Sequence, residues 1–332
     1  MSNPFKVVVT DFVEEPASFE REILGDIAEV KTLQAIGEEH LVGKVENADA
    51  IMLYHYVTIT RPTIERLTNC RLIVRCGVGY DNIDHVFARE RGIDVANVPD
   101  YGSEEVADSA IGMALALARG FHFLNNRLRD DSGAPWSYEP AKPLRRLREE
   151  TFGIVGVGRI GTATALRAKA LGMKVAYYDP YAPDGRDKAL GIRRMEDLDD
   201  LLRQARVLSL HCPGTDETKN LIDDRALSLM PEGSFLVNTA RGTVTDGEAI
   251  AKALQSGKLA GAAIDVLPQE PPTEDTPLLQ AWRDPKHPAH HRLILNPHAA
   301  FYSEEGIDDM RIKGSDNCLR VLKGLPARNV VN

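Results

Sequence analysis

Three glycines in the middle of the chain constrain its fold more than any other feature. They close a short apolar run in Phe152–Gly161 (FGIVGVGRIG), and the next segment, Ile160–Leu171, is rich in helix-forming residues. In the predicted strand, turn and helix, Gly156 permits the turn, Gly158 lets a phosphate approach the backbone, and Gly161 allows close packing. A lone pattern of this kind can be an ordinary glycine-rich turn. The flanking strand and helix favour a site for a dinucleotide pyrophosphate at the helix N-terminus.

A second strand, Lys174–Asp179 (KVAYYD), follows the predicted helix and ends on an acidic residue. Asp179 stands 23 positions after Gly156. A carboxylate at this place would accept hydrogen bonds from the adenosine ribose, whereas the 2′-phosphate of NADP would meet like charge. We therefore expect NAD as the cofactor.

Strands and helices alternate along the whole chain. The expected strands are 6–9, 50–53, 72–75, 152–155, 174–179, 206–210, 234–238, 261–265 and 293–295, and the expected helices are 62–67, 103–129, 196–204, 223–230, 246–256 and 303–323. The segment 103–129 is either one helix or two helices separated at Gly120, and 130–143 is expected to be a polar loop. This alternation predicts an α/β fold built on parallel sheets with helices on both faces.

Composition and charge exclude several classes of function. The chain has 332 residues, enough for two domains, and its net charge is −9 without a long basic run, so direct binding to nucleic acid is not expected. No apolar stretch approaches the roughly 18 residues that a membrane helix needs. The N-terminal MSNPFKVVVTD does not resemble a signal peptide, and the four cysteines are isolated from one another. We expect reduced thiols and a cytoplasmic location.

Three chemically distinct side chains follow predicted strands in the C-terminal half. Arg241, in NTARG, could hold a substrate carboxylate through two parallel hydrogen bonds. His298, in NPHAA, could donate a proton near neutral pH, and Glu270, in DVLPQEP, could keep that histidine charged. Each of them alone can also be an ordinary surface or structural residue. Together they supply what a nicotinamide enzyme needs to reduce a carbonyl group.

Longer motifs resemble those of the D-isomer-specific 2-hydroxyacid dehydrogenases, and within them most closely the C-terminal-binding protein branch. The resemblance runs from about residue 72 to the end and is densest from residue 152. It is carried by RCGVGYDNID from Arg75, EVADS from Glu105, GVGRIG from Gly156, YDPY from Tyr178, FLVNTARG from Phe235, AIDV from Ala263 and HAAFYSE from His298.

This resemblance implies roles for individual residues. Arg241, Glu270 and His298 would be catalytic, with the arginine on the substrate and the glutamate paired with the general acid or base. Substrate binding would involve Arg75, Gly77, Val78, Gly79 and Phe301. Cofactor contacts would come from Gly156, Gly158, Arg159, Ile160, Gly161, Asp179, His211, Cys212, Pro213, Thr218, Thr239, Ala240, Asp265 and Ala300. Phe301 stands where the branch has a tryptophan, which leaves the identity of the substrate open.

The family fold implies two Rossmann-like or flavodoxin-like domains, with the cofactor domain inserted into a discontinuous substrate domain. Residues 1–101 and 303–332 would form the substrate domain, and residues 102–302 the NAD-binding Rossmann domain. Hinges would lie near 101–103 and 299–303, so that closure excludes water, and the helix from residue 103 would contribute to a homodimer.

The segment 281–292 (AWRDPKHPAHHR) is longer than the usual loop of the family. Its histidines, His287, His290 and His291, raise the hypothesis of a zinc site. Because the sequence shows no acidic or cysteine partner that converges on them, we expect a solvated loop and no metal.

The sequence as a whole predicts an NAD-dependent D-2-hydroxyacid dehydrogenase. A hydride would pass between nicotinamide C4 and C2 of a small 2-keto or 2-hydroxy acid, with His298 as the general acid or base. The alternative is an NAD(H)-sensing scaffold that docks other proteins, like the corepressors of the C-terminal-binding protein branch. Among substrates, phosphoglycerate, glyoxylate, hydroxypyruvate and phosphite remain open.

Overall fold

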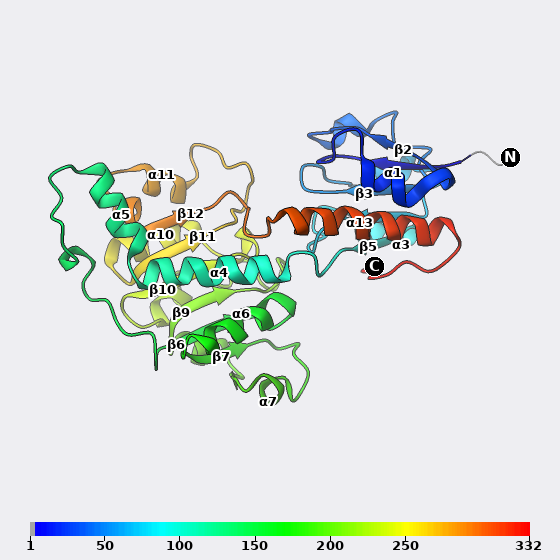
Figure 1. Cartoon of the computed structure of the whole chain (residues 1–332). Coiled ribbons are helices and arrows are strands. Elements are labelled where there is room, and N and C mark those ends of the chain that lie inside the picture. Colours follow the sequence, from blue (N-terminus) through cyan, green and yellow to red (C-terminus); the bar gives the residue numbers. More distant parts are fainter. Residues whose placement is uncertain (1–3) are drawn as a thin grey trace. The chain divides into compact units, whose positions relative to one another are not determined.

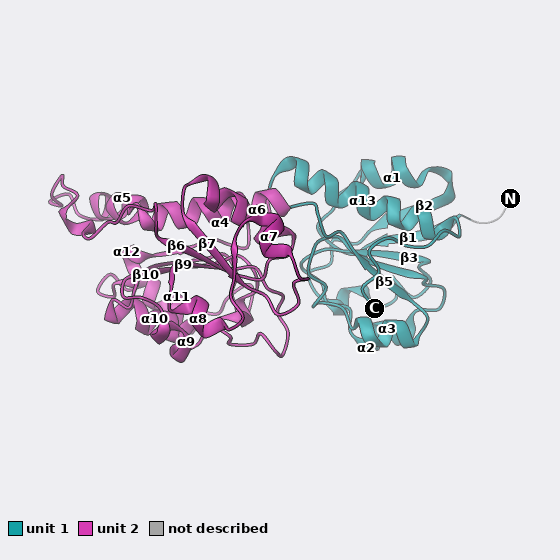
Figure 2. Cartoon of the chain, turned by 90° about the horizontal axis from the view of Figure 1, so that it is seen from below, with its two compact units in different colours: residues 1–102, 303–332 teal, residues 103–302 magenta. Residues whose placement is uncertain are grey.

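A computed structural model describes residues 4–332, which divide into two compact units (Figures 1 and 2). Unit 1 comprises the chain up to Gly102 together with Ser303–Asn332, and unit 2 comprises Ser103–Tyr302. Each unit is a parallel sheet covered by helices, which confirms the predicted α/β fold class. Within residues 4–332, no helix has both the length and the apolar character to cross a lipid bilayer.

The sheet of unit 1 has five parallel strands in the order β2-β1-β3-β4-β5. Its elements are β1 (Phe5–Val9), α1 (Ser18–Leu24), β2 (Ala28–Thr32), β3 (Ala50–Leu53), α2 (Arg61–Arg66), β4 (Leu72–Arg75), α3 (His85–Glu90), β5 (Asp94–Asn97) and α13 (Glu304–Leu322). The central strands β3 and β4 are buried along their whole length, as parallel strands covered on both faces should be. This strand order is typical of flavodoxin-like sheets.

Helix α13 brings the end of the chain back to unit 1, where it packs against α1 (Figure 1). Arg311 donates two hydrogen bonds to Glu20, at 2.8 and 2.7 Å, and the Glu20 side chain is fully buried. Beyond α13 the chain reaches β5, where Val330 pairs with Ala96. The N-terminal sheet is therefore completed by the C-terminal thirty residues, which explains why unit 1 is discontinuous in sequence.

Unit 2 contains a seven-stranded parallel sheet in the order β12-β11-β10-β9-β6-β7-β8. Its strands are β6 (Thr151–Val155), β7 (Lys174–Tyr178), β8 (Arg193–Arg194), β9 (Ala205–Leu210), β10 (Ser234–Asn238), β11 (Leu259–Ile264) and β12 (Leu293–Leu295). Its helices are α4 (Ser103–Ala118), α5 (Phe121–Asp130), α6 (Arg159–Ala170), α7 (Arg186–Leu190), α8 (Leu198–Leu202), α9 (Asp224–Leu229), α10 (Gly247–Ser256), α11 (Pro277–Arg283) and α12 (Ala289–Arg292). Strand β6 is an interior strand that pairs with β9 and β7, so the glycine turn that follows it starts from a strand held on both sides.

Two separate apolar layers cover the faces of this sheet. Side chains of α4 and α6 form one layer, and side chains of α8, α9 and α10 form the other. Helix α10 is capped at its N-terminus by Asp246, whose carboxylate accepts from Glu248 N and Ala249 N, and at its C-terminus by Gly257 in the left-handed conformation. The sheet is thus held on both sides, and its loops are positioned by rigid elements.

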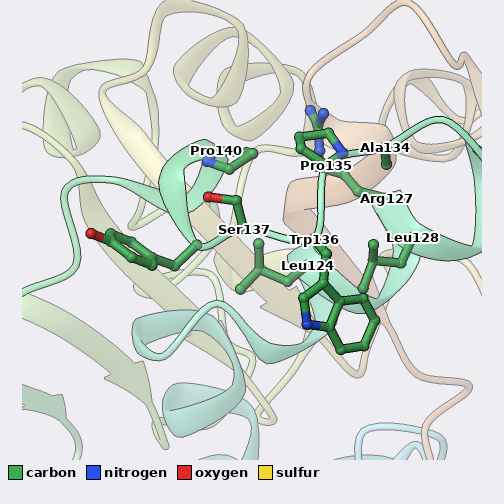
Figure 3. A pocket seen from close by; sticks show the side chains of 9 residues that line it. Leu124, Arg127, Leu128, Ala134, Pro135, Trp136, Ser137 and Pro140 are labelled. Carbon is green, nitrogen blue, oxygen red and sulfur yellow. The ribbon is translucent and has the colours of Figure 1, made fainter.

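The long helical segment after residue 103 consists of two helices. Gly120 has a φ of 66° between α4 and α5, in agreement with the second of the two predicted arrangements. The prediction that the loop begins at residue 130 is wrong, because Asp130 is the last residue of α5. Residues 134–138 and Pro140 line a mainly apolar pocket together with Leu124, Arg127 and Leu128 of α5 (Figure 3). Trp136, at this pocket, is 91% exposed.

Candidate active site

His298 and Glu270 form the central pair of the site. The Nδ1 atom of His298 lies 2.6 Å from Oε2 of Glu270, a short, charge-assisted distance. The second carboxylate oxygen of Glu270 accepts a hydrogen bond from Leu267 N at 2.7 Å. Both carboxylate oxygens are therefore engaged, and Glu270 fixes the orientation of the imidazole.

The loop that carries His298 is held by Asp265, which directly follows β11. The Asp265 carboxylate accepts from Ala299 N at 2.9 Å and from Ala300 N at 3.2 Å, and its backbone oxygen accepts from His298 N at 2.8 Å. His298 itself has a φ of 51°, in the left-handed region that few residues adopt. Several bonds from one aspartate therefore support an unusual backbone conformation at the histidine.

Asn296 also supports this loop, although no sequence motif singled it out. Its side-chain Nδ2 donates to Asp265 Oδ1 at 2.5 Å. Its position could have indicated this role, because Asn296 directly follows strand β12 and stands two residues before His298. Burial raises the pKa of Asp265, although the bonds from Ala299 and Asn296 act in the opposite direction.

Arg241 follows β10 and is placed by a turn built on Asn238. The Asn238 side chain accepts from Ala240 N at 3.0 Å and donates to the backbone oxygen of Arg241 at 3.0 Å. The guanidinium Nη1 donates to Ala240 O at 2.8 Å. The charge of Arg241 also contributes to lowering the pKa of Glu270.

Glu270 keeps its negative charge throughout the neutral range. Burial raises the pKa of this carboxyl, but the hydrogen bond from His298 and the histidine charge outweigh burial, so the pKa lies below its ordinary 4.5. A carboxylate that is charged at every working pH is suited to orient an imidazole and to stabilise its protonated form.

Replacing Glu270 by glutamine should lower thermal stability near pH 7, and this difference from the wild type should shrink as the pH falls below 4.5. A pKa that folding depresses contributes stability above the ordinary value of 4.5, and this contribution is lost as the pH falls through the lower, folded value. Melting temperatures of both proteins between pH 7 and pH 3.5 check this. Glu274→Gln, at an exposed glutamate of the same loop, serves as the control. A difference that does not change with pH would contradict the assignment.

The glycine turn after β6 has the geometry that a dinucleotide requires. Gly156 has a φ of 88°, and a Cβ there would lie 2.9 Å from backbone atoms of His211 and Cys212. A Cβ on Gly161 would lie 2.0 Å from Gly156 O, so only glycine allows α6 to approach the turn this closely. A Cβ on Gly158 would meet no atom within 4 Å. The backbone at this position therefore faces open space beside the N-terminus of α6, where Arg159 and Ile160 stand.

Asp179 lies where the sequence placed it, just beyond β7. Its Oδ2 accepts from Val157 N at 2.9 Å and its Oδ1 accepts from Tyr181 N at 2.9 Å. These bonds attach the acidic residue directly to the glycine turn. A ribose hydroxyl that bonds this carboxylate would thus be fixed relative to the pyrophosphate position.

The loop after β9 carries the next group of predicted cofactor residues. Desolvation of the partly buried His211 imidazole lowers its pKa to about 3, and its Nε2 lies 2.9 Å from Ser209 Oγ. Burial also raises the pKa of Cys212 to about 11, so its thiol is not reactive at neutral pH. Thr218 Oγ1 donates to Pro213 O at 2.6 Å and closes the loop.

Two further predicted cofactor residues, Thr239 and Ala300, are buried. Thr239 Oγ1 and His211 Nδ1 are buried without a hydrogen-bond partner among residues 4–332. A bound ligand is one group that can satisfy buried polar atoms of this kind. Together with the glycine cradle and Asp179, they fit an NAD molecule along this edge of the sheet of unit 2.

The predicted substrate residues Arg75, Gly77, Val78 and Gly79 lie in unit 1, where Arg75 is the last residue of β4 and the other three follow it. Arg75 is buried; its Nη1 donates to Cys76 O at 3.0 Å and its Nη2 lies 3.0 Å from His55 Nδ1. A Cβ on Gly77 would lie 1.3 Å from Arg75 Nη1, so the glycine is needed for this arginine position. Val78 O accepts from Asn97 Nδ2 at 2.7 Å. The substrate roles of these residues stay predictions.

Phe301 lies in unit 2, beside the catalytic candidates. Its ring meets that of His298 edge-on, with centroids 6.1 Å apart and an interplanar angle of 81°. An aromatic side chain at this position limits the space next to the imidazole. It can therefore influence which substrates fit, as the sequence analysis expected of the residue that replaces tryptophan.

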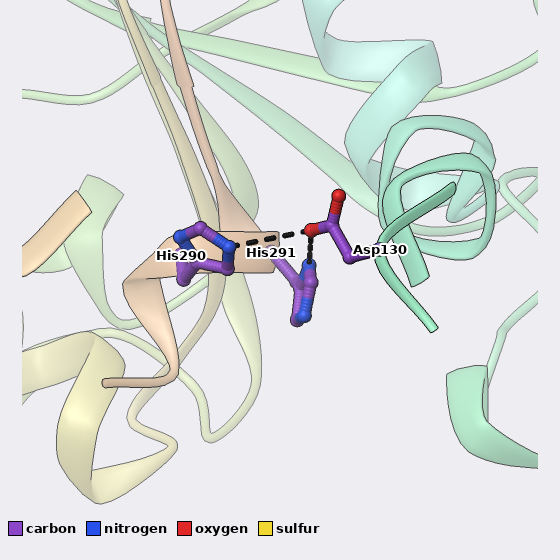
Figure 4. A group of neighbouring side chains, drawn as sticks. All are labelled: Asp130, His290 and His291. Carbon is purple, nitrogen blue, oxygen red and sulfur yellow. Dashed lines mark ion pairs between the residues drawn. The ribbon is translucent and has the colours of Figure 1, made fainter. Parts of the chain in front are cut away.

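The expectation of a solvated histidine loop without an acidic partner is wrong. His290 and His291 belong to the short helix α12 and are only about one quarter exposed. Both imidazoles face the carboxylate of Asp130 at the end of α5 (Figure 4). The partner lies 160 positions away in sequence, at a place that the sequence analysis assigned to the start of a loop.

Comparison with known proteins identifies the family. Residues 111–300 match the family described as D-isomer specific 2-hydroxyacid dehydrogenase, NAD binding domain. The D-3-phosphoglycerate dehydrogenase of Methanocaldococcus jannaschii is 35% identical over 327 residues, which are 98% of this chain and 59% of that protein. The chain thus spans about three fifths of the length of the curated relatives it matches.

Solved structures agree over nearly the whole chain. The D-lactate dehydrogenase from Aquifex aeolicus complexed with NAD and lactic acid has a TM-score of 0.82 at 29% identity, with 96% of both chains covered. A glyoxylate reductase from Paecilomyes thermophila has a TM-score of 0.85 at 26% identity, and covers 100% of this chain and 99% of its own. These similarities do not single out the C-terminal-binding protein branch. The chain belongs to the D-isomer-specific 2-hydroxyacid dehydrogenase family.

Proposed function

We propose that this chain is an NAD-dependent dehydrogenase of D-2-hydroxy acids, which also reduces the corresponding 2-keto acids. The observation that carries the proposal is the 2.6 Å contact between His298 Nδ1 and Glu270 Oε2. A histidine oriented by a carboxylate is the usual arrangement of a general acid and base. The cofactor cradle after β6 belongs to the same sheet.

The protein groups have distinct tasks in this reaction. NADH, when bound along the glycine turn, supplies the hydride that reduces the substrate C2. Arg241 holds the substrate carboxylate and polarises the carbonyl through charge-assisted hydrogen bonds. Because Glu270 engages Nδ1 of His298, the proton passes from Nε2 to the substrate oxygen. In the oxidation direction the same nitrogen accepts that proton.

A panel of 2-keto acids tests the proposal directly. The panel contains 3-phosphohydroxypyruvate, pyruvate, glyoxylate and hydroxypyruvate, and the readout is loss of NADH absorbance. Turnover of at least one member, with the D-hydroxy acid as product, supports the proposal. NADH binding without turnover across the panel contradicts it and would favour the scaffold alternative. None of the relatives reported above supports that alternative, and we do not propose it.

Replacing Asp179 by asparagine should shift the cofactor preference toward NADPH. The asparagine retains one oxygen acceptor but removes the negative charge that would repel a 2′-phosphate. We expect the ratio of kcat/KM for NADH to that for NADPH to fall about tenfold or more, since hydrogen bonds to charged groups contribute about 1.5–3 kcal/mol. Initial rates with both cofactors measure this ratio. An unchanged ratio would show that Asp179 does not face the adenosine ribose.

We also propose that the chain forms a homodimer through the segment that begins at α4. Phe121, Trp136 and Tyr138 are 63, 91 and 65% exposed, and aromatic residues are enriched in such interfaces. Trp136→Glu should shift sedimentation from dimer to monomer at micromolar concentration. A wild-type monomer, or a variant that remains fully dimeric, would count against this interface. A cytoplasmic location remains a prediction.

A further inference from the structure

Three potential metal ligands meet between α5 and α12. They are Oδ2 of Asp130, Nε2 of His290 and Nδ1 of His291 (Figure 4). The carboxylate oxygen lies 3.3 Å from the first nitrogen and 3.7 Å from the second, and all three atoms lie within 4.8 Å of one another. Two imidazoles and one carboxylate form a donor set that zinc and related transition metals prefer.

The spacing of these atoms suits a tetrahedral ion. Zinc bonds of about 2.0–2.2 Å place neighbouring ligand atoms roughly 3.3–3.6 Å apart. The separations of 3.3 and 3.7 Å from the carboxylate oxygen lie near this range, and the two nitrogens, which lie within 4.8 Å of each other, would move closer together on binding. A water molecule would complete the fourth position, since the Asp130 side chain is 44% exposed.

The second nitrogen of His290 is fixed in the way that metal-binding histidines usually are. Its Nδ1 lies 3.0 Å from the backbone oxygen of Trp282, a contact in which the ring N–H donates. The lone pair of Nε2 then points toward the cluster. In His291, Nδ1 is buried and makes no hydrogen bond among residues 4–332. Burial lowers the pKa of His291, which agrees with a neutral imidazole as a ligand.

The guanidinium groups of two neighbouring arginines have other partners than the carboxylate of Asp130. Arg127 and Arg292 lie over the ring of Phe123, at 5.8 and 4.8 Å from its centroid. Arg292 also donates to Ala260 O at 3.1 Å. The simpler explanation of the cluster is an ion pair between Asp130 and a protonated histidine. That ion pair needs only one imidazole, whereas both His290 and His291 face the same carboxylate oxygen of Asp130, with their ring centroids 4.7 Å apart.

We propose that Asp130, His290 and His291 bind one zinc-class divalent cation. The ion would join the last turn of α5 to α12, the short helix before β12. Most of the sequence of unit 2 lies between these two helices. This site is distinct from the residues proposed for the dehydrogenase reaction, and it stands or falls independently of them. Its expected role is to hold α5 against the body of unit 2.

Titration of the full chain, free of any histidine tag and treated with EDTA, tests the proposal. We expect one equivalent of Zn²⁺ by calorimetry, and visible absorption of four-coordinate Co²⁺ without a thiolate band. Asp130→Asn and His290→Gln should each weaken binding by about 10–100-fold. His40→Ala, at a histidine of unit 1, should bind as the wild type does. Zn²⁺ should raise the melting temperature of the wild type but not of the two site variants.

Circular dichroism establishes that each variant is folded, and His291→Gln replaces any variant that is not. One-to-one binding that the site variants weaken supports the proposal. The absence of stoichiometric binding at micromolar Zn²⁺, or equal affinity in the wild type and all variants, overturns it. In that case the cluster is an ion pair of Asp130 with a protonated histidine only.

Discussion

Replacing His298 by asparagine is expected to lower kcat for keto acid reduction by roughly 10²–10⁴-fold, the contribution that a positioned general acid typically makes. The affinity for NADH should remain unchanged, because no predicted cofactor contact is removed. Asparagine is preferred to alanine here because His298 has a φ of 51°, a conformation that asparagine tolerates well. The backbone bond from residue 298 to Asp265 is then retained, and the loss reports the imidazole alone.

Steady-state kinetics with the best keto acid of the panel and fluorescence titration of NADH separate the two effects. His40→Ala, at a half-exposed histidine of unit 1, is the control and should retain wild-type turnover. A variant with turnover within about tenfold of the wild type would remove His298 from the chemistry. An equal loss of NADH affinity and turnover would instead indicate that the histidine loop supports the cofactor site.

The sequence predicts the buried strands of this fold better than the edge strands. The expected strands 50–53, 72–75 and 234–238 are buried along their whole length and have the observed bounds, because each is mainly apolar. The expected strand 293–295 also has the observed bounds, although it lies at the edge of its sheet. Strand β2 was not predicted. It is an edge strand in which exposed Glu29 and Lys31 alternate with buried residues, and it is defined by its pairing with β1. Strand β5, with the sequence DVAN, is too short and polar to signal a strand by itself.

Helices were predicted where a cap or a glycine marked their ends. Asp246 and Gly257 delimit α10, and Ser303 caps α13 through its side chain. Helices α11 and α12 lie in a segment interrupted by prolines, where periodicity gives no signal. They form because their apolar side chains Leu278, Leu279 and Ala289 are buried in unit 2. Tertiary packing thus decides what local sequence leaves open.

The site illustrates the same limit at the level of side chains. His298 and Glu270 were each ambiguous in sequence, and the resemblance to a family, rather than spacing, selected them. Only the folded chain brings their side chains, 28 positions apart, to 2.6 Å. The sequence does not reveal Asp130 as the partner of His290, because the two residues lie 160 positions apart and form no recognisable metal-binding motif. Contacts between side chains of separate elements depend on the order of the strands in the sheet, which could not be predicted from the sequence.

A pair of glycine substitutions should separate the architecture of the cofactor turn from its ligand contact. Gly161→Ala would place a Cβ 2.0 Å from Gly156 O, a backbone atom that cannot rotate away. We expect α6 to shift from the turn, with a loss of about 1–3 kcal/mol or more in stability and a lower melting temperature without cofactor. NADH binding should weaken as a consequence of the displaced helix.

Gly158→Ala should have the opposite profile. Residue 158 has a φ of −68°, and an added Cβ meets no protein atom within 4 Å, so stability should change by no more than about 0.5 kcal/mol. The methyl group would instead occupy the path by which a pyrophosphate reaches the backbone, and NADH affinity should fall at least about tenfold. Thermal unfolding without cofactor and fluorescence titration of NADH measure both quantities. Wild-type NADH affinity in Gly158→Ala would show that the pyrophosphate does not lie over this turn.

An unchanged melting temperature in Gly161→Ala would show that α6 can move away from β6 without loss of stability, contrary to the close packing on which the site depends.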